Sequence, residues 1–366
     1  MVSSYGKGVP PREGNPLELT VIWGSPKGLA RGAAPAGVTD GLATSQAAGD
    51  FDGDGRPDLA TADGDGSIWV LHGPFTKDGA PARRTFTPAD DRGGDRTLEA
   101  LAAGDVDKDG ITDLVGMIGW RESDIDAPNL FFWKGTRQGM APHRTVDNHL
   151  GELVRGDALD VGDVNKDGFE DIVVGETYKG EHGPDIPPGG KITYLPGSAK
   201  GPVDAKSRFF HLETPGVPGS TRDTWAFGSA VSIGDTDGDR YEDIAIGARK
   251  TVGGKANAGT LIALRGGKNG PTVTGAREFT QDTKGVPGTA EKDDMFGSRA
   301  KFIDGNGDGR KDLAVTAIGE NKNAGSVWFF TSNSTGLTAA GSSVFGGKAM
   351  GVSTAAWQRF GERYTG

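Results

Sequence analysis

The sequence contains no cysteine among its 366 residues, which excludes disulfide bridges and thiol catalysis. It contains no run of 18 apolar residues, so no segment predicts a membrane span. Positive charge is scarce, because 40 Lys and Arg residues face 50 Asp and Glu residues and leave a net charge of −10. That balance disfavours nucleic acid and anionic membranes as partners, since both bind basic surfaces. A long 3.6-residue apolar period is also missing, and we expect helices to be few and short.

Turn-forming residues are plentiful by contrast. Glycine accounts for 62 residues and proline for 20, and short alternating runs of β-branched and aromatic residues stand between them. This combination predicts an all-β protein with many turns. The length alone would suggest two or three domains. A repeat fold is an exception to that estimate, because one domain can grow by adding units.

One acidic loop of nine residues recurs five times. Its copies are DFDGDGRPD (50–58), DVDKDGITD (105–113), DVNKDGFED (163–171), DTDGDRYED (235–243) and DGNGDGRKD (304–312). A single copy would be typical of a solvated Asp-Gly turn. Five copies with carboxylate or amide oxygens at positions one, three, five and nine instead indicate the hard-oxygen ligand set that Ca²⁺ prefers. These positions hold 18 Asp residues, and five Ca²⁺ ions would offset the net charge of −10.

Apolar runs flank each loop on both sides. ALDVGD (158–163) precedes the third loop and DIVVGE (171–176) follows it, so that strand, acidic turn and strand form a hairpin. A third run follows each hairpin, and a more variable fourth run such as REFTQD (277–282) comes after it. The third runs cover residues 67–73, 129–135, 191–197, 260–266 and 326–332. Four antiparallel strands per repeat predict the blade of a β-propeller.

The two ends of the chain resemble parts of further repeats. VIWGSPKGL (21–29) matches the third-run pattern, and Phe360-Gly361 repeats a Phe-Gly pair that stands eight residues before the last two loops. We therefore predict five complete repeats and terminal part-blades in a single propeller domain over residues 17–366, after an N-terminal remnant at residues 1–16. Because that remnant has no apolar core, we expect the true N-terminus, with a signal peptide and one more loop, to lie upstream.

The succession of Phe-Gly, a strand, D-x-[DN]-x-D-G-x-x-D and an apolar strand resembles the FG-GAP repeat of integrin α-subunit propellers and bacterial integrin-like proteins. The resemblance covers residues 17–366. It implies a seven-bladed propeller that holds Ca²⁺ in its hairpin turns, on a secreted or surface-exposed, and hence extracellular, protein. Phe-Gly is replaced in the first three copies by Leu42-Ala43, Leu98-Glu99 and Arg155-Gly156.

The resemblance also implies a set of ligands for each loop. The side-chain ligands would be Asp50, Asp52, Asp54 and Asp58; Asp105, Asp107, Asp109 and Asp113; Asp163, Asn165, Asp167 and Asp171; Asp235, Asp237, Asp239 and Asp243; and Asp304, Asn306, Asp308 and Asp312. Position seven would contribute a backbone carbonyl, from Arg56, Ile111, Phe169, Tyr241 and Arg310. Position six is glycine in four copies and Arg240 in the fourth. If that turn is left-handed, Arg costs about 1 kcal/mol relative to Gly, and we expect the fourth site to be the weakest.

Motifs outside the loops give weaker indications. Arg155-Gly156-Asp157 spells a tripeptide that many integrins recognise, but it stands where a turn is needed in any case. The histidines at positions 72, 143, 149, 182 and 211 lack the spacing of a zinc protease, and we expect them to be solvent-exposed. The tryptophans of the third runs are expected to pack between blades. No G-x-S-x-G, Walker or dinucleotide-binding motif is present.

Three classes of function are compatible with these patterns. The first is a non-enzymatic extracellular recognition or adhesion scaffold stabilised by Ca²⁺, which the missing catalytic motifs favour. The second is a carbohydrate-binding propeller, which would gather aromatic and polar residues at one rim. The third is a propeller-fold lyase or hydrolase, which would show a His or Glu cluster with shifted pKa values. We expect a monomer, and the sequence leaves open whether its ligand is a protein or a glycan.

Overall fold

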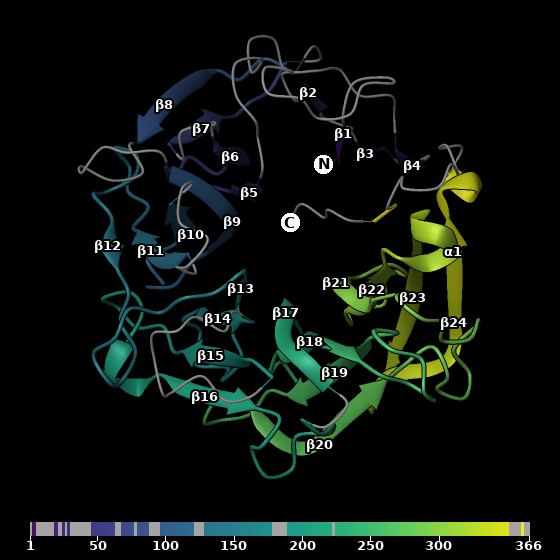
Figure 1. The fold of residues 1–366 in the computed structure, drawn as a ribbon. Helices are drawn as coiled ribbons and strands as arrows, with labels where there is room; N and C mark the ends of the chain where they lie inside the picture. The colour runs from purple at the N-terminus through teal and green to yellow at the C-terminus, as the bar shows by residue number, and fades with distance from the viewer. Residues whose placement is uncertain are drawn as a thin grey trace. The chain divides into compact units, whose positions relative to one another are not determined.

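The computed structural model describes residues 2–4, 18–20, 24–25, 28–29, 45–62, 67–76, 79–87, 96–120, 128–177, 189–221, 224–350 and 360–361. The chain divides into two compact units. The first comprises residues 1–105, 109–146 and 363–366, and the second comprises residues 106–108 and 147–362. Strands dominate both units, as Figure 1 shows. The part of the chain described here contains a single α-helix, α1 (Glu320–Asn323), and no helix long and apolar enough to cross a membrane.

The first unit contains two four-stranded antiparallel sheets. One sheet has the order β5 (Gln46–Gly49), β6 (Asp58–Ala62), β7 (Ile68–His72), β8 (Arg83–Thr87). The other is formed by β9 (Arg96–Gly104), β10 (Asp113–Trp120), β11 (Asn129–Trp133) and β12 (Arg144–Thr145). Two short hairpins also belong to it, β1 (Val2–Ser4) with β2 (Glu18–Thr20) and β3 (Gly24–Ser25) with β4 (Gly28–Leu29).

The second unit contains three sheets of the same kind. The first has the strands β13 (Ala158–Gly162), β14 (Asp171–Glu176), β15 (Lys191–Leu195) and β16 (Arg208–His211). The next has β17 (Thr224–Gly234), β18 (Asp243–Lys250), β19 (Thr260–Arg265) and β20 (Thr272–Phe279). The last has β21 (Phe296–Ile303), β22 (Asp312–Ala317), β23 (Ser326–Asn333) and β24 (Gly336–Gly346). The described residues of this unit also form α1 and two 3-10 helices, η1 (Asp204–Lys206) and η2 (Gly347–Met350).

These sheets confirm the predicted all-β fold of four-stranded propeller blades. Each of the five complete repeats forms one meander, in which strands follow one another in the sheet as they do in the sequence. The segment 21–29 differs from its prediction as a third strand. Its described residues form β3 and β4, which pair with each other through Gly24–Leu29 and Ser25–Gly28. The predicted total of seven blades and the domain bounds stay predictions.

The hydrophobic cores lie between neighbouring sheets rather than within single sheets. Phe227 and Phe296, from the Phe-Gly pairs before the last two loops, are 0% and 1% exposed, and each joins a cluster drawn from two successive sheets. Trp133 and Trp328 are buried, as predicted for third strands. Trp69 is an exception, since it is 37% exposed and contacts Phe86 of β8 with ring centroids 5.0 Å apart. Trp23 and His182 lie outside the described residues.

The glycine of each Phe-Gly pair allows the backbones of adjacent blades to touch. Gly228 and Gly297 have φ of +98° and +87°, a left-handed conformation that glycine adopts without a steric cost. A Cβ atom on Gly175 of β14 would lie 2.0 Å from the carbonyl oxygen of Gly228, and one on Gly247 of β18 would lie 2.0 Å from that of Gly297. Blade packing at these points therefore depends on the absence of two side chains.

Candidate metal sites in the acidic loops

Every acidic loop joins the first and second strands of its sheet in the same register. The residue before the loop pairs with the aspartate at position nine, which begins the second strand. These pairs are Gly49–Asp58, Gly104–Asp113, Gly162–Asp171, Gly234–Asp243 and Ile303–Asp312. The predicted hairpins are thus present in all five repeats.

Two positions of each loop have left-handed backbone. Position six has φ between +70° and +87° in all five copies, at Gly55, Gly110, Gly168, Arg240 and Gly309. Position four has φ between +57° and +82°, at Gly53, Lys108, Lys166, Gly238 and Gly307. The turn at Arg240 is therefore left-handed, as the sequence analysis supposed. The same conformation at Lys108 and Lys166 was not predicted, because only a glycine would have signalled it.

The aspartate at position one organises the turn by accepting backbone hydrogen bonds. In the first loop, the amides of Asp54 and Gly55 donate to the two carboxylate oxygens of Asp50 at 3.0 and 2.8 Å. Loops two, three and five repeat both bonds. In the fourth loop, the amides of Gly238 and Arg240 donate to Asp235 at 2.7 and 2.9 Å. Arg240 therefore keeps the bond that glycine makes elsewhere.

The aspartate at position five holds position seven. Its Oδ1 accepts the amide of the residue two positions later at 2.8–2.9 Å in all five loops. This bond aligns the backbone at Arg56, Ile111, Phe169, Tyr241 and Arg310 in the same way. Their role as carbonyl ligands stays a prediction.

The aspartate at position nine is buried and connects the loop to the third strand. Its exposed fraction is 3% or less in every copy. One carboxylate oxygen accepts a backbone amide just beyond the third strand, or near its end in the fifth repeat. The donors are Gly73, Gly135, Gly197, Gly266 and Ser332, at 2.8–3.0 Å. Burial raises the pKa of Asp171 to about 7 and that of Asp243 to about 6, because charge is costly to desolvate.

Carboxylates converge in the loops in a manner that fits a divalent cation. Ligand atoms lie within 4.8 Å of one another in Asp50, Asp52 and Asp54; in Asp105, Asp107 and Asp113; and in Asp235, Asp237 and Asp239. In the third and fifth loops, Asn165 and Asn306 stand at position three and each accepts the amide two residues later at 2.8 Å. In the fifth loop, the Oδ2 atom of buried Asp312 has no hydrogen-bond partner among the described residues. A further group in the first loop joins a ring nitrogen of His72 to Asp52 and Asp58. The carboxylate and amide oxygens of the other groups suit Ca²⁺.

Side chains that the sequence analysis did not assign reach four of the loops from the end of the third strand or just beyond it. The buried Nδ1 of His72 lies 3.1 Å from both Asp52 Oδ2 and Asp58 Oδ2. Lys134 Nζ lies 2.8 Å from Asp109 Oδ2, and the hydroxyl of Tyr194 donates to Asp171 Oδ2 at 3.0 Å. Arg265 Nη1 lies 2.8 Å from Asp243 Oδ2. Three of the four residues immediately precede the closing glycine of the third run, which is the signal that could have found them.

Successive loops within a unit are also linked to one another. The residue at position eight of one loop bonds to position one of the preceding loop. The amide of Thr112 donates to the Asp50 carbonyl at 2.9 Å, and the amide of Asp50 donates to the Thr112 hydroxyl at 3.0 Å. In the second unit, the amide of Glu242 donates to the Asp163 carbonyl at 3.2 Å and the amide of Lys311 to the Asp235 carbonyl at 2.7 Å. The loops therefore lie at one end of their sheets.

The motifs outside the loops have structural roles. Gly156 is buried, and the Asp157 carboxylate accepts hydrogen bonds from the amide and hydroxyl of Thr177 at 3.2 and 2.5 Å. The tripeptide 155–157 is thus folded against β14 rather than presented at a loop tip. The expectation of solvent-exposed histidines is wrong for His72, which is 3% exposed, and for half-buried His143 and His211, and it is confirmed for His149. His143 packs on Phe131.

Known proteins resemble this chain in sequence. The FG-GAP-like repeat family matches residues 50–116, and the FG-GAP repeat family matches residues 155–193 and 227–263. Integrin alpha pat-2 of Caenorhabditis briggsae is 30% identical over 228 residues, which are 60% of this chain and 17% of that protein. Integrin alpha-PS2 of Drosophila melanogaster is 31% identical over 57% of this chain and 15% of its own length. The chain spans less than a fifth of these relatives.

Comparison of three-dimensional structures adds little to the sequence matches. Rhamnogalacturonan lyase YesW superimposes with a TM-score of 0.39 and 11% sequence identity, over 84% of this chain and 73% of that chain. A similarity this low supports neither a shared activity nor a shared substrate.

Proposed function

We propose that this FG-GAP repeat protein, integrin α-like over 60% of its length, is a non-enzymatic extracellular recognition or adhesion scaffold whose acidic loops bind Ca²⁺. The observation that carries the proposal is that the same three kinds of hydrogen-bond connection recur in all five loops. In each one, position one holds the turn, position five holds position seven, and position nine holds the third strand. One function repeated five times favours a structural role over a single active centre.

The electrostatics of the loops explain why a cation would stabilise the blades. Each loop gathers three or four carboxylates, and the one at position nine is withdrawn from water. Such groups repel one another, and a buried carboxylate without a counter-charge is costly. A divalent ion at the loop would offset both effects and join the first, second and third strands of one blade. Millimolar Ca²⁺ outside cells suits sites of moderate affinity.

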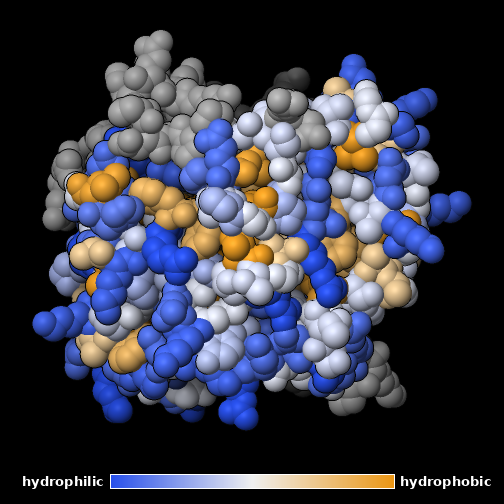
Figure 2. Space-filling model, turned by 90° about the horizontal axis from the view of Figure 1, so that it is seen from below, coloured by the Kyte–Doolittle hydropathy of each residue, from blue (hydrophilic) through white to orange (hydrophobic). Residues whose placement is uncertain are grey.

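Recognition would then belong to the segments that differ between repeats. The face shown in Figure 2 is mostly polar and charged, with hydrophobic groups in smaller patches. An exposed aromatic pair, Trp69 and the 50% exposed Phe86, lies on the neighbouring strands β7 and β8 of the first sheet. A pair of this kind also favours the alternative of carbohydrate binding, since sugars stack on aromatic rings. A glycan array beside a panel of immobilised proteins would separate the two, and W69A would test whether the pair takes part.

Thermal unfolding with and without Ca²⁺ tests the metal proposal. A ligand at 100 times its dissociation constant stabilises the folded state by about 2.7 kcal/mol per site. We expect chelation to lower the melting temperature by several degrees and excess Ca²⁺ to restore it. Asp167→Asn should reduce the restoration, whereas Asp293→Asn, an equal charge change on a side chain outside the loops that is 56% exposed, should not. An identical melting temperature in chelator and in Ca²⁺ would refute the proposal.

A further inference from the structure

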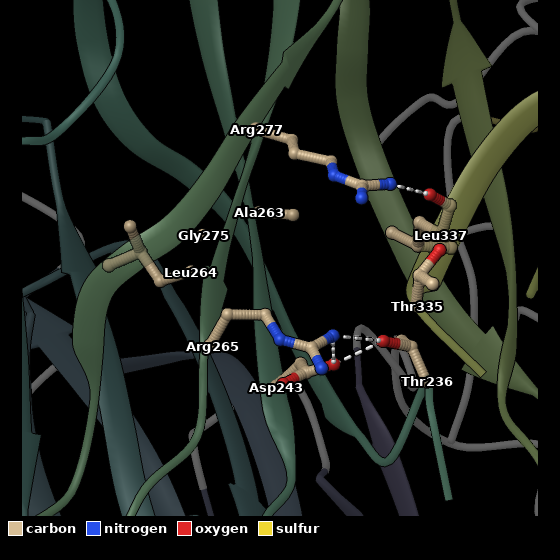
Figure 3. Close-up of a pocket in the computed structure, with 9 residues that line it drawn as sticks. All are labelled: Thr236, Asp243, Ala263, Leu264, Arg265, Gly275, Arg277, Thr335 and Leu337. Atoms are coloured by element: carbon tan, nitrogen blue, oxygen red, sulfur yellow. Dashed lines mark hydrogen bonds and ion pairs between the residues drawn. The ribbon is translucent and has the colours of Figure 1, made fainter. Parts of the chain in front are cut away.

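A cationic side chain from the third strand of the same sheet contacts the carboxylates of the fourth loop. Arg265, the last residue of β19, extends its guanidinium between the carboxylates of positions three and nine. Nη1 lies 2.8 Å from Asp243 Oδ2, and Nη2 contacts Asp237 Oδ2. Nη1 also donates to the hydroxyl of Thr236 at 3.1 Å. Figure 3 shows the side chain extending across from its strand to Thr236 and Asp243.

This arrangement is largely withdrawn from solvent. The side chains of Asp243 and Asp237 are 4% and 11% exposed, and that of Arg265 is 21% exposed. A guanidinium stays charged at all physiological pH values, and its planar fork matches two carboxylates at once. One of the two carboxylate charges is therefore already balanced without an ion. A divalent ion in the same place would have to displace Arg265 and leave its charge without these partners, which is costly.

In the third and fifth loops, no cationic side chain of the described residues contacts the aspartate at position nine. The group that faces Asp171 Oδ2 in the third loop is the neutral hydroxyl of Tyr194, which also accepts from Asn165 at 3.3 Å. In the fifth loop, Asp312 Oδ2 has no hydrogen-bond partner among the described residues, and the ring of Phe329 occupies the adjacent space beside Gly305. Guanidinium groups also contact single carboxylates elsewhere, since Arg83 Nη2 lies 2.6 Å from Asp52 Oδ2 in the first loop and Arg310 Nη1 lies 3.5 Å from Asp308 Oδ2 in the fifth. Among the described residues, Arg265 is the arginine that contacts both position three and position nine of a loop.

We propose that Arg265 takes the place of the divalent ion in the fourth loop, so that this repeat is a metal-independent copy among metal-binding ones. The inference rests on the proposed function for the other loops. This proposal differs from the weak fourth site that the sequence predicts from Arg240. Arg240 keeps its backbone hydrogen bond to Asp235, so its left-handed conformation adds backbone strain without removing a loop contact. Arg265 removes the need for an ion.

Metal stoichiometry tests the proposal directly. The full chain is stripped with chelator, titrated with Ca²⁺ and analysed by calorimetry and elemental analysis. We expect wild type to bind at most four ions and Arg265→Gln to bind one more than wild type. Arg277→Gln is the matched control, because Arg277 borders the same small pocket and donates to the Leu337 carbonyl at 2.9 Å without contacting the loop. It should leave the stoichiometry unchanged.

A second measurement keeps the two proposals distinguishable. Arg265→Gln should melt several degrees below wild type in chelator, and Ca²⁺ should recover most of that loss by filling the vacated loop. If Ca²⁺ raised the melting temperature of Arg265→Gln but not that of wild type, the result would support the role of Arg265 and refute the proposed function. Five ions in wild type, or a loss in Arg265→Gln that Ca²⁺ does not recover, would overturn the role of Arg265.

Discussion

The Asp171 carboxylate accepts the backbone amide of Gly197 at 3.0 Å and so joins the third acidic loop to the residue just beyond the third strand of the same sheet. Its other oxygen accepts from the amide of Val164 at 3.1 Å and from the hydroxyl of Tyr194 at 3.0 Å. One buried side chain therefore connects the loop, the second strand that it begins, and the third strand. The equivalent amide bond recurs in all five repeats.

Removing this side chain should destabilise the protein even without metal. Asp171→Ala leaves three donors without their acceptor, and each buried unsatisfied group costs about 1–3 kcal/mol. Urea unfolding in chelator should show a loss of at least about 2 kcal/mol. Asp167→Ala is the control, because it removes an exposed acceptor of a single amide, that of Phe169. Equal losses in the two variants would contradict this account of position nine.

Chelated protein should become less stable as pH rises from 5 to 8. Burial raises the pKa of Asp171 to about 7 and that of Asp243 to about 6, both above the ordinary value of 3.8. Between the unfolded and folded pKa values the folded state holds protons that the unfolded chain has lost, so stability falls with pH across that window. Melting temperatures in chelator should fall accordingly, and Asp171→Asn should flatten the slope. A rising slope in wild type would contradict the prediction.

Calcium should oppose this pH effect, because the ion binds the deprotonated carboxylates. The difference in melting temperature between Ca²⁺ and chelator should therefore grow from pH 5 to pH 8. Calorimetric titration below pH 7 should also release protons, which shows as a dependence of the binding enthalpy on the ionisation enthalpy of the buffer. A difference that is constant with pH would indicate that the ion does not bind at these groups.

Replacing Arg240 by glycine should stabilise the fourth loop. Arg240 has φ of +70°, a conformation that costs a non-glycine residue about 1 kcal/mol, and its amide bond to Asp235 does not need the side chain. Arg240→Gly should therefore raise the free energy of unfolding by about 0.5–1 kcal/mol. The reverse change, Gly110→Ala, places a Cβ in open space at φ of +83° and should cost a similar amount. A loss of stability in Arg240→Gly would show that the side chain has a role of its own.

A methyl group at Gly247 should cost more than one at Gly110. The added Cβ would lie 2.0 Å from the carbonyl oxygen of Gly297, whereas Gly110 has nothing within 4 Å. Overpacking at a rigid contact costs about 1–3 kcal/mol. The free energies of unfolding of Gly247→Ala and Gly110→Ala, measured by chemical denaturation, compare steric overlap with backbone strain. A smaller loss of stability in Gly247→Ala would contradict the close packing of the blades.

Local patterns explain how much of the molecule could be predicted from its sequence. The acidic loops and the strands beside them depend on neighbouring residues, and their hairpins are present as expected. The closing glycine of the third run marks where His72 and Arg265 stand in the sequence. Which loop carboxylates they contact depends on the register between strands that are separated by connections of different length. Lys108 and Lys166 adopt left-handed backbone without being glycine, because the carboxylate at position one holds the turn around them.

The contact between Gly175 and Gly228 bears on how an array of similar repeats can change over time. Segments that encode related repeats can recombine, and unequal crossing-over deletes, duplicates or reorders them. A rearrangement that sets a Phe-Gly repeat after one with a side chain at the Gly175 position would force that side chain into the Gly228 backbone. A rearrangement that removes or adds two adjacent repeats together, with both glycines of the contact, avoids this overlap. A missing methyl group thus restricts which rearranged genes still encode a folded protein.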